Sequence, residues 1–317
     1  MRYFDLSGFW ECETAGRRAG MRLPGTLDEN GIGFPDDPTK QWKMDEVERI
    51  GFWQPGDPIV TRLTRKHTFE GAANLSRCIE WDAPKDRRVF VDVERARHLR
   101  LRVNGQEARL YRPASLSAPY TFEVTGLTTG HDQFSFLSDN SYPGWPREAI
   151  QYSSAASDET QTNWNGLLGS IRIRTEGQIF LSDVRVYPRD DQVQIAVEID
   201  AACSWQGILH FSCDALAEET DRAIRVTPGI QKFCFDLKLK EGAPRWELGE
   251  GNLCHLAVSA PGLEPYEARF GIRTFRAEKG HLTLNHRRIF LRGEANCAVF
   301  PETGYCPMDV ESWKTVL

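Results

Sequence analysis

Carboxyl groups are the most abundant candidates for proton chemistry in this chain, which carries 45 acidic residues among 317. Adjacent pairs occur at Asp36-Asp37, Asp190-Asp191 and Glu218-Glu219. Two carboxyl groups can divide the roles of general acid and general base only where burial or repulsion separates their pKa values. All three pairs lie in turn-like sequence, and nothing nearby suggests burial. We therefore expect these pairs to be solvated rather than catalytic.

The imidazoles and thiols are dispersed along the chain. The seven histidines form no H-E-x-x-H constellation and no two cysteines form a C-x-x-C pair, so we assign no metal site and no cofactor. The cysteines are not spaced as a disulfide framework, and most are expected to be buried thiols in a reducing compartment. The eight are Cys12, Cys78, Cys203, Cys213, Cys234, Cys254, Cys297 and Cys306.

The charge balance argues against nucleic acid as a partner, because the formal net charge is −6 and the pI is near 5.7. The basic run RARHLRLR (95–102) alternates with apolar residues and is typical of a strand with one solvent-facing side. No apolar run approaches the ~18 residues that cross a bilayer, and the amino terminus lacks the apolar stretch of a signal peptide. We expect no membrane association and a cytoplasmic location, unless a leader has been removed.

Short strands must position whatever chemistry the chain has. Segments of alternating apolar and polar residues recur, and Asn104-Gly105 between two of them predicts a tight hairpin. This pattern predicts an all-β fold, with a jelly-roll β-sandwich over residues 1–187. Two long loops that carry tryptophans, 23–42 and 141–169, interrupt it and favour a functional role. The alternating segments are 87–94, 98–111, 120–125, 132–140 and 170–175.

The composition changes near YPRDDQ (187–192), and residues 188–275 contain five to seven further strand-like segments. Their number and spacing predict an immunoglobulin-like β-sandwich, although the Cys…Trp…Cys signature of antibody domains is missing. A third part, 276–317, begins with a hairpin that turns at Asn285-His286. It ends with a helix that Asp309 can cap.

These features occur in an order that resembles the amino-terminal half of glycoside hydrolase family 2, which includes β-galactosidases, β-glucuronidases and β-mannosidases. The resemblance covers essentially the whole chain. It implies that FLRGEAN (290–296) is the first strand of a (β/α)8 barrel and that the helix after Asp309 is the first barrel helix. The chain would then be truncated at the start of that barrel. The matching motifs are LPGTLDENGIG (23–33), RVNGQ (102–106), TQTNWNGLLGSI (160–171), FGIRTF (270–275), LTLNHRRIFLRG (282–293) and PETGYCPMD (301–309).

Enzymes of that family are retaining glycosidases, whose two catalytic carboxyl groups come from later barrel strands. The resemblance therefore implies that this chain lacks both groups and does not cleave glycosides alone. Its partners would be the terminal sugar of a glycoside and the missing barrel of the same chain. Family members often assemble, so a homo-oligomer is an open alternative.

In that family, loops of the jelly roll line the subsite for the terminal sugar. The matching residues here would be Thr26, Asp28, Asn30, Thr162, Asn163 and Trp164, with polar groups for the hydroxyls and an indole face for the ring. The alternative is purely structural. In that case LPGT is a turn, Asp28 and Asn30 cap local backbone, and Trp164 packs its loop onto the sandwich.

At the start of the expected barrel, Glu294, Asn296 and Cys297 would face the substrate. β-Galactosidases resemble R-G-V-N-R-H-E-H-H-P where this chain has RGEANCAVFP (292–301). Cys297 replaces a substrate-contacting histidine, and a thiol cannot make a comparable hydrogen bond, which puts β-galactosidase specificity in doubt. Glu294 could instead pair with Arg292. Cys297 has no surrounding His-Asn pattern that would make it a nucleophile.

Two other functions fit the same strands. A stand-alone, lectin-like carbohydrate-binding protein would need no barrel, although it would have no use for the final hairpin and helix. A structural adhesion module is compatible with the fold but leaves the tryptophan-bearing loops unexplained.

Overall fold

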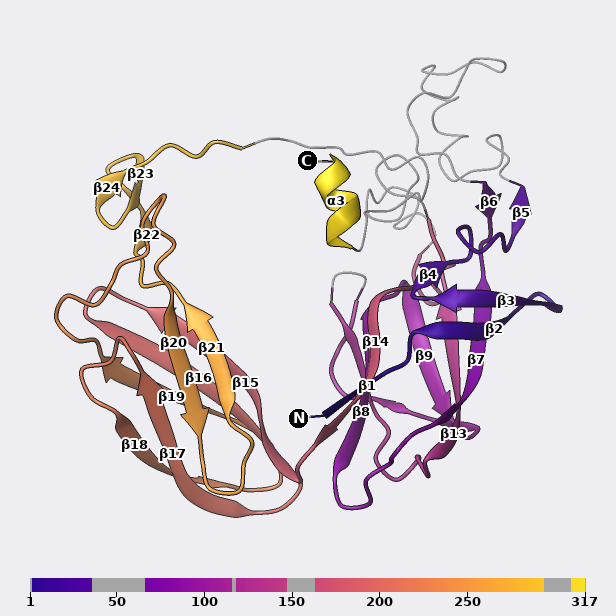
Figure 1. The fold of residues 1–317 in the computed structure, drawn as a ribbon, viewed down its shortest axis with the longest axis horizontal. Helices are drawn as coiled ribbons and strands as arrows, with labels where there is room; N and C mark the ends of the chain where they lie inside the picture. The colour runs from indigo at the N-terminus through magenta and orange to yellow at the C-terminus, as the bar shows by residue number, and fades with distance from the viewer. Residues whose placement is uncertain (1, 36–65, 116–117, 147–162, 294–308, 317) are drawn as a thin grey trace. The chain divides into compact units, whose positions relative to one another are not determined.

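The structure, a computed structural model, describes residues 2–35, 66–115, 118–146, 163–293 and 309–316 (Figure 1). Nearly all of the described elements are β-strands, which confirms the predicted all-β class. The chain forms two compact units, one built on Arg2–Thr175 and the other on Glu176–Glu294. Each unit has its own hydrophobic core.

The first unit is a sandwich of two sheets. One sheet has the order β1-β14-β8-β12-β11, with β4 paired to β14, and the other has the order β10-β9-β13-β7-β2-β3. A separate two-stranded ribbon joins β5 to β6. The strands are β1 (Arg2–Asp5), β2 (Gly8–Thr14), β3 (Arg17–Leu23), β4 (Gly25–Thr26), β5 (Phe34–Pro35), β6 (His67–Thr68), β7 (Ala72–Glu80), β8 (Arg88–Arg95), β9 (His98–Val103), β10 (Gln106–Glu107), β11 (Arg109–Leu110), β12 (Tyr120–Glu123), β13 (His131–Asp139) and β14 (Gly166–Glu176).

The core between these sheets follows the alternation in the sequence. In β9, Leu99, Leu101 and Val103 are buried while Arg100 and Arg102 are exposed, as the basic run predicts. The Asn104-Gly105 turn is also confirmed, because Val103 pairs with the residue after the turn. Both turn residues have positive φ, 52° and 79°, which Asn and Gly adopt most readily.

A fully buried carboxylate, Asp132, organises the end of the sandwich beside this turn. Its Oδ1 accepts hydrogen bonds from Asn104 Nδ2 (2.8 Å) and the Thr129 backbone N–H (2.7 Å), and its Oδ2 accepts one from Trp81 Nε1 (2.8 Å). Burial alone would raise the pKa of Asp132, but these donors outweigh it and lower the pKa. The ionised carboxylate is thus part of the fold.

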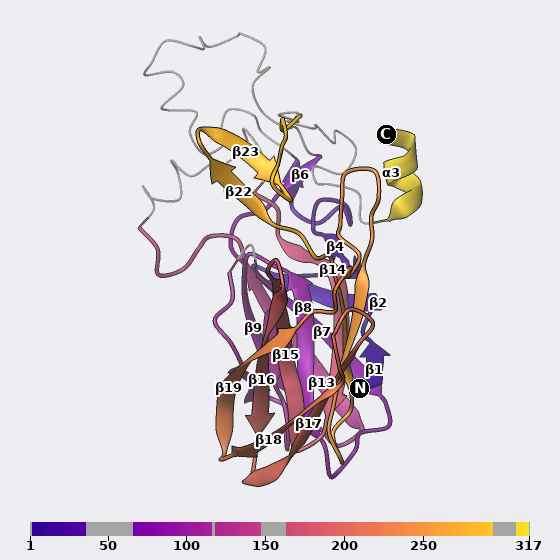
Figure 2. The same cartoon turned by 90° about the vertical axis from the view of Figure 1, so that its left-hand side faces the viewer.

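The second unit is a smaller sandwich of a three-stranded sheet, β15-β16-β19, and a four-stranded sheet, β18-β17-β20-β21. Figure 1 labels all seven strands, and Figure 2 shows β15, β16 and β19 from the side. Six of its strands, β16 to β21, lie within residues 188–275, the range for which the sequence predicts five to seven strand-like segments. The strands are β15 (Ile179–Pro188), β16 (Gln192–Ala201), β17 (Trp205–Cys213), β18 (Thr220–Val226), β19 (Gly229–Lys238), β20 (Cys254–Ser259) and β21 (Tyr266–Phe270).

The junction between the units lies at Thr175 and Glu176, earlier in the chain than the predicted change at residue 187. The strand before that predicted change, β15, pairs with β16 along its length and so belongs to the second sheet system. YPRDDQ is therefore the turn of a hairpin inside the second unit, where Arg189 N–H donates to Gln192 O (2.8 Å).

A three-stranded hairpin sheet follows β21 and consists of β22 (Phe275–Glu278), β23 (His281–Leu284) and β24 (Arg287–Arg288). It turns at Asn285-His286 as predicted, with φ values of 47° and 65°. Asn285 fixes this sheet to the second sandwich, because its Nδ2 donates to Trp246 O (3.0 Å) and Glu247 Oε1 (2.7 Å).

The described helix, α3 (Val310–Val316), begins after Asp309, and Asp309 Oδ1 accepts the Ser312 backbone N–H at 2.8 Å. The predicted helix cap is confirmed. In the described ranges, no helix is long and apolar enough to cross a membrane.

The prediction that most cysteines are buried is wrong for half of those described. Cys12 and Cys254 are buried, but Cys78, Cys203 and Cys234 are exposed. Cys78 shows the reason, because side chains along a strand alternate between the two faces of the sheet. Its neighbour Ile79 in β7 points into the core, so Cys78 points to solvent. All six described cysteines are free thiols, and Cys297 and Cys306 lie outside the described residues.

Candidate functional site

The motif LPGTLDENGIG folds into a single helical turn that is capped at both ends. Thr26 Oγ1 accepts the Glu29 backbone N–H (3.1 Å), and Glu29 Oε2 accepts the Thr26 N–H (3.4 Å), a reciprocal capping box. At the other end, Ile32 N–H donates to Leu27 O (2.8 Å) across Gly31, whose φ is +70°. This is a Schellman-type ending that favours glycine.

Asp28 and Asn30 use their side chains to fix this turn in place. Asn30 Oδ1 accepts the Arg22 N–H (2.7 Å), and Asn30 Nδ2 donates to Thr26 O (2.8 Å). Asp28 Oδ1 accepts the His67 backbone N–H at 2.7 Å, which joins the turn to β6. These contacts favour the structural interpretation of the motif, although Asp28 and Asn30 remain partly accessible.

Three buried asparagines connect this region to the ends of β13 and β14. Asn140 Nδ2 donates to Phe69 O (2.7 Å) and Asn163 O (2.8 Å), and its Oδ1 accepts the Gly71 N–H (2.9 Å). Asn165 Nδ2 donates to Gly71 O at 2.8 Å. Because all three amides donate to backbone carbonyls and Asn140 also accepts, this asparagine cluster (Asn140, Asn163 and Asn165) fixes several backbone segments at once.

Backbone pairing holds the two motif loops directly against each other. Thr26 pairs with Gly166 at the start of β14, and Leu27 N–H donates to Asn165 O (2.9 Å). Gly166 has a φ of +126°, and a Cβ there would lie 2.4 Å from Gly25 O. The sequence needs glycine at position 166 because both the backbone angle and the space exclude a side chain.

Trp164 is 5% exposed and lies under a guanidinium group. The Arg97 Cζ lies 4.5 Å from the centre of its ring, and Arg97 Nη1 donates to Tyr142 Oη at 2.8 Å. Burial raises the pKa of Tyr142, whose φ is +55°. This cation–π stack anchors the 163–166 segment, so one face of the indole is covered.

The structure thus brings five of the predicted residues to one edge of the first sandwich: Thr26, Asp28, Asn30, Asn163 and Trp164. Thr162, Glu294, Asn296 and Cys297 lie outside the described residues. The sequence reasoning missed Asn140, Asn165, Arg97 and His67. For Asn165, the sequence signal was the triplet Asn163-Trp164-Asn165. Two amide side chains on either side of a tryptophan in a loop can form hydrogen bonds to different backbone segments.

The described part of this edge can present hydrogen-bonding groups but shows no catalytic pair. The shifted carboxyl groups that the structure describes, Glu107, Asp132, Asp190 and Asp309, all have a lowered pKa, whereas a general acid needs a raised one. Asp190-Asp191 and Glu218-Glu219 are exposed, as predicted, and Asp36-Asp37 lie outside the described residues. The described ranges contain no group of three or more potential metal ligands.

No protein-family model matches the sequence, and no curated protein matches it. Solved structures do. The chain is similar to a GH2 β-galacturonidase from Eisenbergiella tayi bound to galacturonate, with 15% identity and a TM-score of 0.64 over 90% of this chain and 46% of that one.

Two further structures match in the same way. A β-D-mannosidase from Dictyoglomus thermophilum gives 16% identity and a TM-score of 0.62 over 92% of this chain and 40% of the mannosidase. A Bacteroides uniformis β-glucuronidase gives 12% identity and a TM-score of 0.66 over 92% of this chain and 35% of the glucuronidase. The chain spans less than half the length of these proteins. It therefore has the fold of part of these glycosidases, which confirms the fold that the sequence resemblance implied.

Proposed function

We propose that this chain forms the non-catalytic part of a retaining exo-glycosidase of the glycoside hydrolase family 2 type, with jelly-roll loops that line the subsite for the terminal sugar. The observation that carries the proposal is the match of 90–92% of this chain to only 35–46% of three glycosidases. The two sandwiches and the hairpin sheet of residues 275–288 would then support a separate catalytic domain.

The geometry of the loop edge supports a subsite role. The Thr26–Ile32 turn, the β6 strand and the 163–166 segment are joined by buried amides and by backbone pairing. Such a frame keeps partly accessible groups, among them Asp28 and Asn30, in fixed positions without reorganisation on binding. Preorganised polar groups are what recognition of sugar hydroxyls requires.

Hydrolysis itself is assigned to the separate catalytic domain. A retaining mechanism needs two carboxyl groups about 5–5.5 Å apart, one of which attacks while the other donates a proton. Since the shifted carboxyl groups among the described residues all titrate low, none of them is poised as the acid. We therefore expect the 317-residue chain to bind sugar weakly and not to turn it over.

The test combines an assay with a titration. The purified chain should show no hydrolysis of aryl galactosides, glucuronides, galacturonides or mannosides. Calorimetric titration with the free sugars should give dissociation constants in the millimolar range or weaker, because part of the subsite wall is supplied by another domain.

Two matched variants localise the site. Asp28→Asn keeps the oxygen that accepts the His67 N–H but removes the charge, so the fold should persist while binding weakens about threefold or more. Asp191→Asn, an exposed carboxylate in the second unit, should leave binding unchanged. Measurable turnover by this chain would disprove the non-catalytic role. Micromolar affinity for a monosaccharide would favour the lectin-like alternative.

A further inference from the structure

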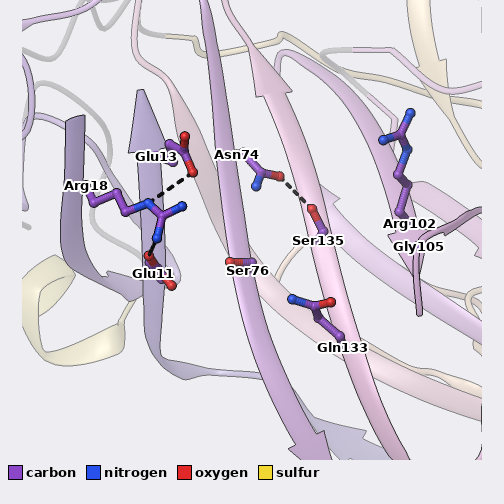
Figure 3. A pocket seen from close by; sticks show the side chains of 9 residues that line it. All are labelled: Glu11, Glu13, Arg18, Asn74, Ser76, Arg102, Gly105, Gln133 and Ser135. Carbon is purple, nitrogen blue, oxygen red and sulfur yellow. Dashed lines mark hydrogen bonds and ion pairs between the residues drawn. The ribbon is translucent and has the colours of Figure 1, made fainter. Parts of the chain in front are cut away.

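An open groove crosses the outer face of the β10-β9-β13-β7-β2-β3 sheet, away from the loop edge. Its volume is about 380 Å³. Its lining comes from the neighbouring strands β9, β13, β7, β2 and β3, and Figure 3 shows the side chains that line it. The groups that matter most are Glu11, Glu13, Arg18, Asn74, Ser76 and Arg102.

One wall of this sheet groove is an ion-paired set that is already in position. Arg18 Nη1 lies 3.5 Å from Glu11 Oε1, and Arg18 Nε lies 3.3 Å from Glu13 Oε2 (Figure 3). One guanidinium thus faces two carboxylates, which leaves carboxylate oxygens able to accept further hydrogen bonds. Hydroxyl groups are suitable donors for them.

The floor and the opposite wall hold groups whose hydrogen-bonding capacity is unused. Ser135 Oγ donates to Asn74 Oδ1 (2.5 Å), but among the described residues no hydrogen bond involves the Ser76 hydroxyl, the Gln133 amide or the Arg102 guanidinium. Ser135 pairs with both Ser76 and Arg102 across the sheet. Small side chains therefore form the floor and Arg102 stands at its far side.

An aromatic platform lies next to the carboxylate wall. Phe9 is 71% exposed, and a Cβ on Gly20 would lie 2.3 Å from its ring. The ring therefore rests on the bare backbone of β3, with its other face open to solvent. Phe9 lines a second hollow, of about 430 Å³, that also contacts Glu11, Arg18 and Ser76 and so continues the groove.

The other sheet of the same sandwich shows that this openness is not general. On its outer face, Asp92 Oδ2 accepts from Arg174 Nε (2.8 Å), and Glu123 Oε1 accepts from Arg88 Nη2 (2.8 Å). Both guanidinium groups also cover the ring of Phe90, which is fully buried. That face is closed by its own side chains, whereas the sheet groove keeps its groups available.

From these observations we infer that the sheet groove binds a short oligosaccharide that carries a carboxylate, as a site separate from the proposed terminal-sugar subsite. The carboxylate would form a charge-assisted pair with Arg102. Ring hydroxyls would bond to Ser76, Asn74 and the carboxylate wall, and a C–H face would rest on Phe9. Strands β9 and β2 are three strand spacings apart, about 14 Å, so the groove suits a chain of sugars rather than one.

Charge complementarity favours this occupant over an acidic peptide. A peptide with carboxylates on successive residues would place negative charge against Glu11 and Glu13, with few hydroxyls to compensate. An acidic oligosaccharide offers several hydroxyl donors for each carboxylate, so hydroxyls can pair with the acceptors of the Glu11 and Glu13 wall while a carboxylate faces Arg102, whose guanidinium makes no hydrogen bond among the described residues.

The test uses the full 317-residue chain and calorimetric titration with trigalacturonate, maltotriose and triglutamate. We expect trigalacturonate to bind with a dissociation constant of roughly 0.1–1 mM, and both other ligands to bind at least about tenfold more weakly. Arg102→Ala should weaken trigalacturonate binding at least about tenfold. Ser76→Val raises the groove floor with a residue that strands favour, and should have a similar effect.

Arg189→Ala, which removes an exposed arginine from the second unit, is the matched control and should leave binding unchanged. The inference is overturned if trigalacturonate fails to saturate below ~10 mM, if either comparison ligand binds equally well, or if Arg102→Ala binds like the parent. Because Asp28 is not in the groove, Asp28→Asn should not affect this binding, which separates the outcome from that of the subsite proposal.

Discussion

Replacing Asn140 by aspartate tests whether the asparagine cluster holds the loop edge together. The side chain is fully buried, its Nδ2 donates to Phe69 O and Asn163 O, and its Oδ1 accepts the Gly71 N–H. Asn140→Asp keeps the shape but places an oxygen against two carbonyl oxygens. Each of the two buried acceptors left without a donor costs about 1–3 kcal/mol, so we expect the free energy of unfolding to fall by roughly 2–6 kcal/mol at pH 7.

The effect should depend on pH in a defined direction. Burial and the two facing carbonyls disfavour the charged form, so the new carboxyl group has a pKa above the ordinary value of about 3.9. A group whose folded-state pKa is raised stabilises the fold at low pH and loses that contribution as the pH rises through the folded pKa. The difference between the variant and the parent should therefore narrow as the pH is lowered from 7 towards about 4.

Denaturant unfolding followed by tryptophan fluorescence gives the free energies, and hydrogen exchange of peptides from residues 2–175 assigns the transition to the first unit. Asn252→Asp is the matched control, because that exposed side chain donates only one bond, to Arg245 O at 3.0 Å. It should cost less than about 0.5 kcal/mol. If Asn140→Asp costs no more than this control, or if its deficit grows at low pH, the asparagine cluster does not hold the edge.

Three further perturbations probe separate features of the fold. Asp132→Asn should lower the free energy of unfolding by about 2–4 kcal/mol and remove part of the sensitivity to acid. Because the pKa of Asp132 is lowered in the fold, its stabilising contribution is present above about pH 4 and is lost as the pH falls. Urea midpoints measured between pH 5 and about 2.5 would show this loss in the parent and not in the variant. Gly166→Ala should lower the free energy of unfolding, measured by heat or denaturant, by more than about 3 kcal/mol. The control Gly16→Ala should lower it by only about 1 kcal/mol, because a Cβ at Gly16 would meet nothing within 4 Å. Alkylation of the native chain at neutral pH, followed by peptide mapping, should modify the exposed Cys78 and spare the buried Cys12. Burial raises the pKa of Cys12 to about 11, so little reactive thiolate is present. Equal labelling of both cysteines would contradict the assigned burial.

The features that the sequence predicts well are those decided by neighbouring residues. Asn104-Gly105 and Asn285-His286 form the expected turns because only a few residue types accept positive φ at both positions. Asp309 caps α3 through a bond that spans three residues. The alternation of β9 likewise predicts its buried face correctly.

The features that escaped prediction depend on partners distant in the chain. β15 resembles a last strand of the first sandwich until its pairing with β16 is known. Trp164 sits in a polar loop and suggests an exposed platform, but Arg97, far away in sequence, stacks on it. Asn140 carries no periodic signal at all, because its role is set by the carbonyl groups that converge on it.

The β5–β6 ribbon and the Asn140–Asn163 bonds have one more consequence. Pairing of Pro35 with His67 brings together the two ends of the intervening stretch, and the asparagine contacts do the same for the chain between residues 140 and 163. The cost of closing a connection rises only with the logarithm of its length, about 0.6 kcal/mol for each doubling. Changes in the length of either stretch should therefore cost the scaffold little stability.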